Sequence, residues 1–139
     1  TKVLSKELFD KKKVVLFAVP GAFTPACSAS HLPGYVQNFE KIKEKGVAEV
    51  VCLSVNDVFV MSAWATEHAA DSKVTMLADG NGDYVKSLGL QFDGSGFGLG
   101  MRSQRFAMII DNGCIEKIFL EEAVSDVKLS SAENVIASL

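Results

Sequence analysis

The chain has 139 residues, of which 48% are apolar and 22% charged, and this composition is ordinary for one globular domain. A formal net charge of −3 gives no general attraction to nucleic acid or to an anionic membrane. No apolar stretch approaches the roughly 18 residues that a membrane span needs, so we expect neither partner. Three cysteines are too few, and odd in number, for a secreted disulfide scaffold, which favours an intracellular, reducing location.

The amino-terminal end carries no basic segment followed by an apolar one, as a secretory signal would. Because the chain starts at Thr1 rather than at a methionine, the sequence is compatible with the earlier removal of a targeting peptide. The sequence therefore does not distinguish cytoplasm, mitochondrion and plastid.

The first elements are a buried strand and a helix. Residues 13–19 form an almost continuous apolar run that ends at a Pro-Gly pair, which predicts a strand covered on both faces. Thr24 suits the N-cap of a helix and Pro25 its first position. We expect this helix to run to about Lys45, where Gly46 ends it.

The remaining elements continue an alternation of strands and helices. The glycine-rich residues 94–100 predict a loop, and we find no repeat and no linker. Strand, helix, strand, helix, strand, hairpin and closing helix predict an α/β fold with a mixed sheet. We expect a strand over 47–55, a helix capped by Asp57, a strand over 73–77, a helix over 84–88, a hairpin with strands 104–110 and 114–119, and a final helix that opens with Ser130 and Glu133 as a capping box and ends near Leu139.

Cys27 is the candidate nucleophile. With Thr24 as the N-cap, Cys27 falls in the first turn of the helix, directly after a buried strand. Free backbone N–H groups and the positive end of the helix dipole favour a thiolate there, and the thiolate is the reactive form. Most free cysteines are small buried apolar residues, however, so position alone leaves a structural role open.

The wider motif decides between these interpretations. Residues 20–28, Pro-Gly-Ala-Phe-Thr-Pro-Ala-Cys-Ser, resemble the peroxidatic loop of the peroxiredoxins, and more narrowly of their type II, or Prx5-like, branch. Residues 52–57, 77–80 and 102–106 resemble the same branch in order and at suitable spacing. The resemblance implies a thioredoxin-like fold, with a central mixed sheet flanked by helices, in a single domain over residues 1–139. It also implies that the family's opening amino-terminal hairpin is absent.

The resemblance further implies a thiol-dependent peroxidase and assigns roles to four residues. Cys27 matches the peroxidatic cysteine, which reduces a hydroperoxide and becomes a sulfenic acid. Thr24 matches the threonine that bonds the thiolate and the peroxide, and Pro20 matches the proline that shields the sulfur from water. Arg105 matches the arginine that stabilises the thiolate, which makes it a better candidate than Arg102. Taken singly, these residues could instead cap a helix, turn the chain or lie on a surface strand.

The sulfenic acid must then be recovered by a thiol. Some members of the branch carry a resolving cysteine just ahead of the last helix, but residues 127–130 contain none. Cys52 matches a cysteine of the plant type II members, yet it lies mid-strand, so we favour a core residue over a resolving thiol. Cys114 is interpreted as structural or incidental. We therefore expect an external reductant, either glutathione with glutaredoxin or thioredoxin.

Other chemistries find little support. There is no Cys-x-x-Cys, and two histidines are too few for a metal site, so we expect no metal and no cofactor. The loop that starts at Asp79 fails the calcium pattern, because it has Tyr84 and Leu90 where Gly and Glu are needed. His31 could form a Cys–His hydrolase pair with Cys27, but no orienting partner is evident.

One function of a different class stays open. The chain could be a non-catalytic redox sensor or partner-binding module in which Cys27 is oxidised stoichiometrically. The sequence also leaves the oligomeric state open between a monomer and a homodimer.

Overall fold

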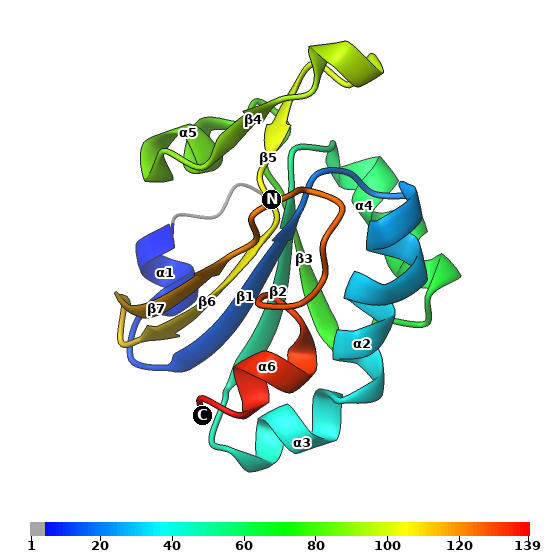
Figure 1. Ribbon diagram of the computed structural model, residues 1–139. Coiled ribbons are helices and arrows are strands. Elements are labelled where there is room, and N and C mark those ends of the chain that lie inside the picture. The colour runs from blue at the N-terminus through cyan, green and yellow to red at the C-terminus, as the bar shows by residue number, and fades with distance from the viewer. Residues whose placement is uncertain (1–4) are drawn as a thin grey trace.

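A computed structural model describes residues 5–139, and its centre is a five-stranded mixed sheet in the order β3-β2-β1-β6-β7 (Figure 1). The three strands β1, β2 and β3 are parallel, while β6 and β7 are antiparallel to their neighbours. This is the predicted thioredoxin-like arrangement. The strands are β1 (Lys13–Val19), β2 (Glu49–Ser54), β3 (Val74–Ala78), β6 (Phe106–Asp111) and β7 (Cys114–Leu120).

The central strand β1 is the apolar run predicted from the sequence. Every residue from Val14 to Val19 is fully buried, because β1 lies between two strands and has helices over both of its faces. Its antiparallel partner β6 aligns Ala18 with Phe106. The carboxyl end of β1 therefore lies beside the amino end of β6.

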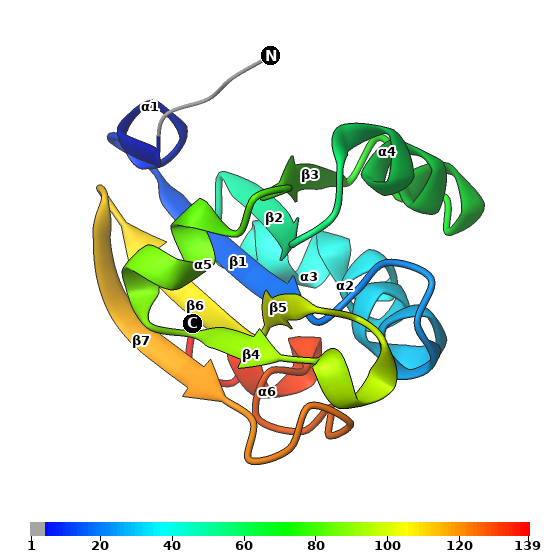
Figure 2. The same ribbon diagram turned by 90° about the horizontal axis from the view of Figure 1, so that it is seen from above.

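Helices cover both faces of the sheet, which gives a single three-layer domain (Figure 2). One apolar core lies between the sheet and the helices α2, α3, α4 and α6, and a second core lies under α1 and α5. The helices are α1 (Ser5–Phe9), α2 (Leu32–Gln37), α3 (Phe39–Glu44), α4 (Val58–Glu67), α5 (Asp83–Leu88) and α6 (Ala132–Ile136). Among residues 5–139, no helix combines the length and the apolarity that crossing a membrane requires.

The single helix predicted from Thr24 to Lys45 is wrong in its continuity. A π-helical turn, η1 (Cys27–His31), precedes α2, and Asn38 separates α2 from α3. Pro33 explains the π turn. Proline has no N–H to donate to the preceding turn, and in a regular α-helix its ring would clash with the carbonyl four residues earlier. The wider turn accommodates it, and its last bond runs from the N–H of Leu32 to the carbonyl of Cys27.

The helix caps were predicted with mixed success. Asp57 caps α4 as expected, because its carboxylate accepts from the N–H of Val60 at 2.8 Å. The cap of α6 is Ser131 rather than Ser130, and the helix ends at Ile136. Ser130 does not serve as the cap because its hydroxyl and N–H are both bonded to the buried carboxylate of Glu121.

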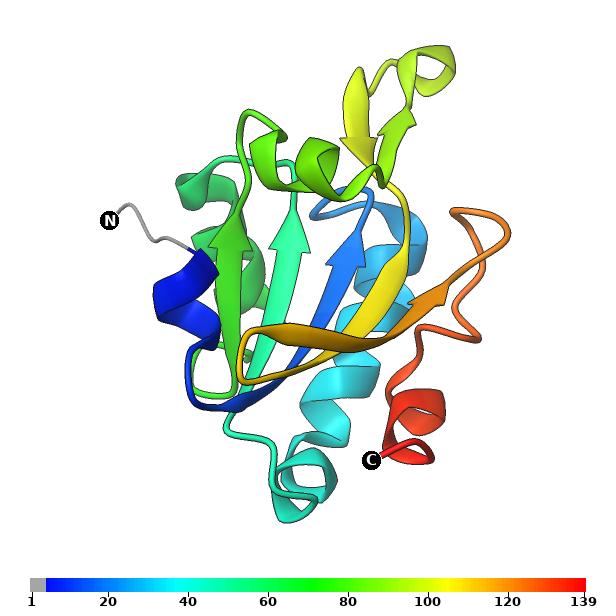
Figure 3. The same cartoon turned by 90° about the vertical axis from the view of Figure 1, so that its left-hand side faces the viewer.

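The glycine-rich stretch is part of a small hairpin that projects from the sheet (Figure 3). Two short strands, β4 (Gln91–Asp93) and β5 (Met101–Ser103), flank a 3-10 turn, η2 (Ser95–Phe97). The guanidinium of Arg102 joins this hairpin to the residue that follows β2, because it donates to the carbonyl of Leu99 at 2.9 Å and to that of Val55 at 3.3 Å. Arg102 therefore has a structural position there.

Candidate active site

Cys27 and Arg105 meet in the interior of the protein. Cys27 follows the loop after β1, Arg105 directly precedes β6, and the pairing of these two strands brings them together. Nη2 of Arg105 donates to Sγ of Cys27 at 3.0 Å, and both side chains are buried. A guanidinium that contacts sulfur where water is excluded attracts strongly any negative charge that develops on that sulfur.

The guanidinium of Arg105 is held by two further partners. Its Nε donates to the carbonyl of Val124 at 2.8 Å, and its Nη1 lies 2.7 Å from Nδ1 of His31. Each of the three nitrogens therefore has a partner, only one of which is the sulfur. Because Arg105 is just 2% exposed, the direction of Nη2 is set by these contacts and not by solvent.

His31 is a neutral acceptor for Arg105. An arginine can only donate, so Nδ1 of His31 must accept, and the proton lies on Nε2, 3.1 Å from the carbonyl of Ser130. Burial and the positive charge of Arg105 lower the pKa of His31 to about 3. Both ring nitrogens are engaged away from Cys27, which leaves no base for a Cys–His hydrolase pair.

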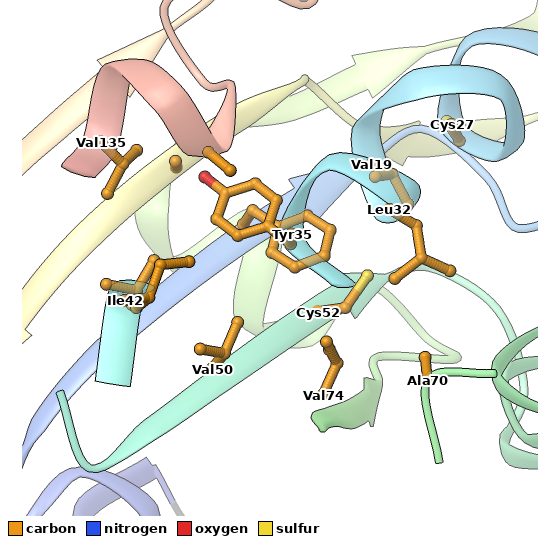
Figure 4. Close-up of a cluster of buried hydrophobic side chains, with 14 of the residues drawn as sticks. Val19, Cys27, Leu32, Tyr35, Ile42, Val50, Cys52, Ala70, Val74 and Val135 are labelled. Carbon is orange, nitrogen blue, oxygen red and sulfur yellow. The ribbon is translucent and has the colours of Figure 1, made fainter. Parts of the chain in front are cut away.

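Tyr35 completes this layer of contacts. Its hydroxyl donates to the same Ser130 carbonyl at 2.7 Å, and its ring stacks on Phe17 with centroids 3.9 Å apart. Burial raises the pKa of Tyr35 well above its usual value, so the hydroxyl keeps its proton and remains a donor. Figure 4 shows Tyr35 within the core below the turn that carries Cys27.

Thr24 and Pro20 lie on the segment that joins β1 to Cys27. Pro20 is buried where β1 ends, and Thr24 is half-buried three residues before the cysteine. The Thr24 hydroxyl donates to the carbonyl of Gly21 at 2.6 Å instead of capping the helix. Because a hydroxyl has a single proton, this bond leaves the oxygen of Thr24 free to accept from another donor.

Neither of the other two cysteines is bonded to Cys27. All three thiols are free, and Cys52 is fully buried in β2. Burial, reinforced by the nearby Cys27, raises the pKa of Cys52, so it stays a protonated and poorly nucleophilic thiol. In the view of Figure 4, Val19 and Leu32 lie between the two cysteines. Cys114 is exposed at the start of β7.

Sequence reasoning weighed His31 as a partner of Cys27 but missed that it accepts from Arg105, and it missed the contacts of Tyr35, Ser130 and Glu121 around this pair. His31 and Tyr35 follow Cys27 at spacings of four and eight residues, so helical periodicity could have placed all three on one face. Glu121 and Ser130 come from the segment after β7, and no local pattern linked that segment to Cys27.

A buried cysteine bonded to an arginine at the end of the central strand of a thioredoxin-like sheet defines a class of thiol-dependent oxidoreductases. The family model described as Redoxin matches residues 1–136, and the chain belongs to this family as a peroxiredoxin, a thiol peroxidase.

Curated relatives and solved structures agree with this assignment. A peroxiredoxin of Synechocystis sp. is 45% identical over an alignment of 141 positions, and the alignment covers 97% of this chain and 74% of the relative. Peroxiredoxin-2D of Arabidopsis thaliana is 46% identical over 128 residues, covering 92% and 78% of the two chains. The crystal structure of reduced Prx3 from Vibrio vulnificus in complex with H2O2 is 51% identical with a TM-score of 0.91, covering 96% of this chain and 86% of that one.

The neutral state of His31 predicts how stability depends on pH. Its pKa is about 3 in the folded chain against 6.5 for an ordinary histidine, so below pH 6.5 the unfolded chain binds a proton that the native state does not. This contribution is complete above pH 6.5 and is lost at about 1.4 kcal/mol per pH unit as the pH falls towards 3. His31→Gln should therefore flatten the dependence of the unfolding free energy, measured with urea at about pH 7, 6 and 5.

The matched control is His68→Gln, which removes the other histidine, from the end of α4. This variant should keep the wild-type slope. An unchanged slope in His31→Gln would show that His31 does not stay neutral in the folded protein.

Proposed function

We propose that the protein reduces hydrogen peroxide and small alkyl hydroperoxides through Cys27, with Arg105, Thr24 and Pro20 completing the site. The observation that carries this proposal is the 3.0 Å contact between Nη2 of Arg105 and Sγ of Cys27. The peroxide complex of the similar Vibrio vulnificus Prx3 supports the choice of substrate.

In the proposed reaction, the Cys27 thiolate attacks the terminal oxygen of the hydroperoxide in line with the O–O bond. A sulfur–oxygen bond forms, the O–O bond breaks, and the second oxygen leaves with the electron pair and takes up a proton as water or alcohol. Sulfur is oxidised to sulfenic acid and the peroxide is reduced. Arg105 stabilises the negative charge as it moves from sulfur to oxygen, since its donors are already oriented. Thr24 accepts from the peroxide O–H because its own proton is bonded to Gly21.

Variants of the site test these roles. Mixing reduced protein with stoichiometric peroxide should give sulfenic acid at Cys27 by mass spectrometry, and Cys27→Ser should give none. Arg105→Gln should lower the second-order rate constant by about 10²- to 10³-fold, the cost of one preorganised donor. Thr24→Val should lower it while Thr24→Ser, which keeps the hydroxyl, should not. Oxidation no faster than that of free cysteine, and equal in Cys27→Ser, would exclude the proposal.

The recycling step is proposed to use an external thiol, glutathione with glutaredoxin or thioredoxin, at an intracellular location. Cys52 is buried and kept protonated, which disfavours it as a resolving thiol. Cys114 pairs with Asp111, which pairs with Lys13, so it lies at the opposite end of β1 from the Cys27 loop. Six residues of strand separate those ends, roughly 20 Å at 3.3 Å per residue. The burial of Cys52 and the distance of Cys114 therefore both support an external resolving thiol.

Peptide mapping after one peroxide turnover identifies the thiol that reacts with Cys27. We expect a persistent sulfenic acid without reductant, and wild-type turnover for Cys52→Ala and Cys114→Ala with at least one of the two reducing systems. A Cys27–Cys52 disulfide that forms at the turnover rate, with turnover lost in Cys52→Ala, would contradict an external resolving thiol. Absence of sustained peroxide consumption with either system would favour the redox sensor instead.

We also propose that the protein forms a homodimer through an apolar rim made of Phe23, Val58 and Phe59. These side chains are 53%, 57% and 81% exposed. A hydrogen bond from Ala22 N–H to Asn56 Oδ1 at 2.9 Å holds the loop of Phe23 close to the residues just before α4, which supports grouping the three side chains in one rim. Phe23 has a φ of 63°, a costly conformation that holds the ring outward. Continuous apolar patches of this kind mark interfaces.

Sedimentation velocity over a range of concentrations tests the dimer. The wild-type protein should associate as its concentration rises. Phe59→Glu should shift the monomer–dimer equilibrium towards the monomer, because association would bury an unpaired charge. The control Leu129→Glu changes another exposed apolar residue outside the rim and should leave the association unchanged. A wild-type protein that stays monomeric at every concentration would refute the dimer.

A further inference from the structure

The buried carboxylate of Glu121 lies directly after β7 and is only 6% exposed. One of its oxygens, Oε2, accepts from Lys128 N–H at 2.7 Å, Ser130 N–H at 2.8 Å and Ser130 Oγ at 2.6 Å. Burial raises the pKa of this carboxyl, but the hydrogen bonds outweigh burial and hold it below its usual value. Glu121 is therefore ionised at neutral pH, and its charge is satisfied by the donors of a single loop.

That loop, residues 122–130, supplies the contacts that orient Arg105. The carbonyl of Val124 accepts from Nε of Arg105, and the carbonyl of Ser130 fixes His31, which accepts from Nη1. The contacts of two of the three guanidinium nitrogens, Nε and Nη1, thus depend on a loop whose end is hydrogen-bonded to Glu121. The third nitrogen, Nη2, points at Sγ of Cys27. The N–H of Glu121 also donates to the carbonyl of Arg105 at 3.1 Å, so the residue that precedes the loop is itself bonded to this arginine.

We infer that Glu121 is a positioning residue for Arg105, acting through the shape of residues 122–130 and not through its own charge. The inference rests on the proposed role of Arg105 in peroxide reduction. The carboxylate holds the loop, the loop holds two guanidinium nitrogens, and these direct the third nitrogen at the sulfur. Small displacements of a preorganised donor cost large factors in rate, so a residue that reaches the sulfur only through the loop and Arg105 can control the reaction.

The sign of the effect separates positioning from direct electrostatics. A negative charge near the site disfavours a thiolate, so its removal alone would increase the thiolate fraction of Cys27. Loss of positioning acts in the opposite direction, because a displaced guanidinium stabilises the thiolate less. The two explanations therefore predict opposite changes in the same measurement.

Glu121→Gln and Glu122→Gln form a matched pair, since both remove one negative charge and Glu122 is exposed. In Glu121→Gln, the rate constant for oxidation of Cys27 by hydrogen peroxide should fall by about ten- to hundredfold. The thiolate absorbance at 240 nm, at a fixed mildly acidic pH, should fall with it. Glu122→Gln should match the wild type in both measurements.

A double-mutant cycle excludes a merely structural role. If Glu121 acts through Arg105, Glu121→Gln should cause little further loss in an Arg105→Gln background. A general weakening of the fold would instead lower the rate by the same factor in both backgrounds. Ser130→Ala removes one of the three bonds to Glu121 and should give a smaller loss in the same direction, which serves as the test if Glu121→Gln fails to fold.

Three results would overturn the inference: a wild-type rate in folded Glu121→Gln, an increased thiolate absorbance in that variant, or an additive double-mutant cycle. A wild-type protein that does not react with peroxide would refute the proposed function instead, and the two failures are thus distinguishable.

Discussion

The contact between the guanidinium of Arg105 and the sulfur of Cys27 is the constraint on which the rest of this structure depends. A negative charge that develops on a buried sulfur is costly unless a charged donor reaches it, and Nη2 of Arg105 lies 3.0 Å from Sγ of Cys27, which is fully buried. The contact exists because β1 and β6 are antiparallel neighbours, which places the end of one strand beside the start of the other. The central sheet is therefore both the core of the fold and the frame of the site.

Three titratable residues around this pair are each held in one protonation state. His31 is kept neutral, Tyr35 is kept protonated, and Glu121 is kept ionised, each by its own surroundings. Within the described part of the chain, every buried side-chain nitrogen and oxygen has a hydrogen-bond partner. Networks that are satisfied in this way rigidify a site, because any displacement leaves a buried group without a partner. Rigidity of this kind suits the proposed reaction, in which negative charge moves from sulfur to the departing oxygen of the peroxide.

The differences between the predicted and observed elements have local causes. The Cys27 helix was predicted as continuous because Thr24, Pro25 and Gly46 mark its two ends, whereas Pro33 forces a π turn inside it. Ser130 matched a capping box but is drawn inward by Glu121, and Ser131 takes the cap. A missing donor and a steric clash overrode the local pattern in the first case, and a competing hydrogen bond to a buried carboxylate overrode it in the second.

The amino-acid sequence by itself predicted the five strands of the central sheet, the start of α4, the extent of α5 to within one residue and the α/β class, because these follow from periodicity and capping. A contiguous motif also proposed Cys27 as the reactive cysteine. The sequence also proposed Arg105, but only through resemblance. The tertiary structure alone decided that Arg105 reaches Cys27, 78 residues earlier in the chain. It also decided that Arg105 contacts His31, which contacts Ser130, which in turn is bonded to Glu121. Strand pairing and loop closure set these contacts, and their energies depend on partners that are distant in the chain.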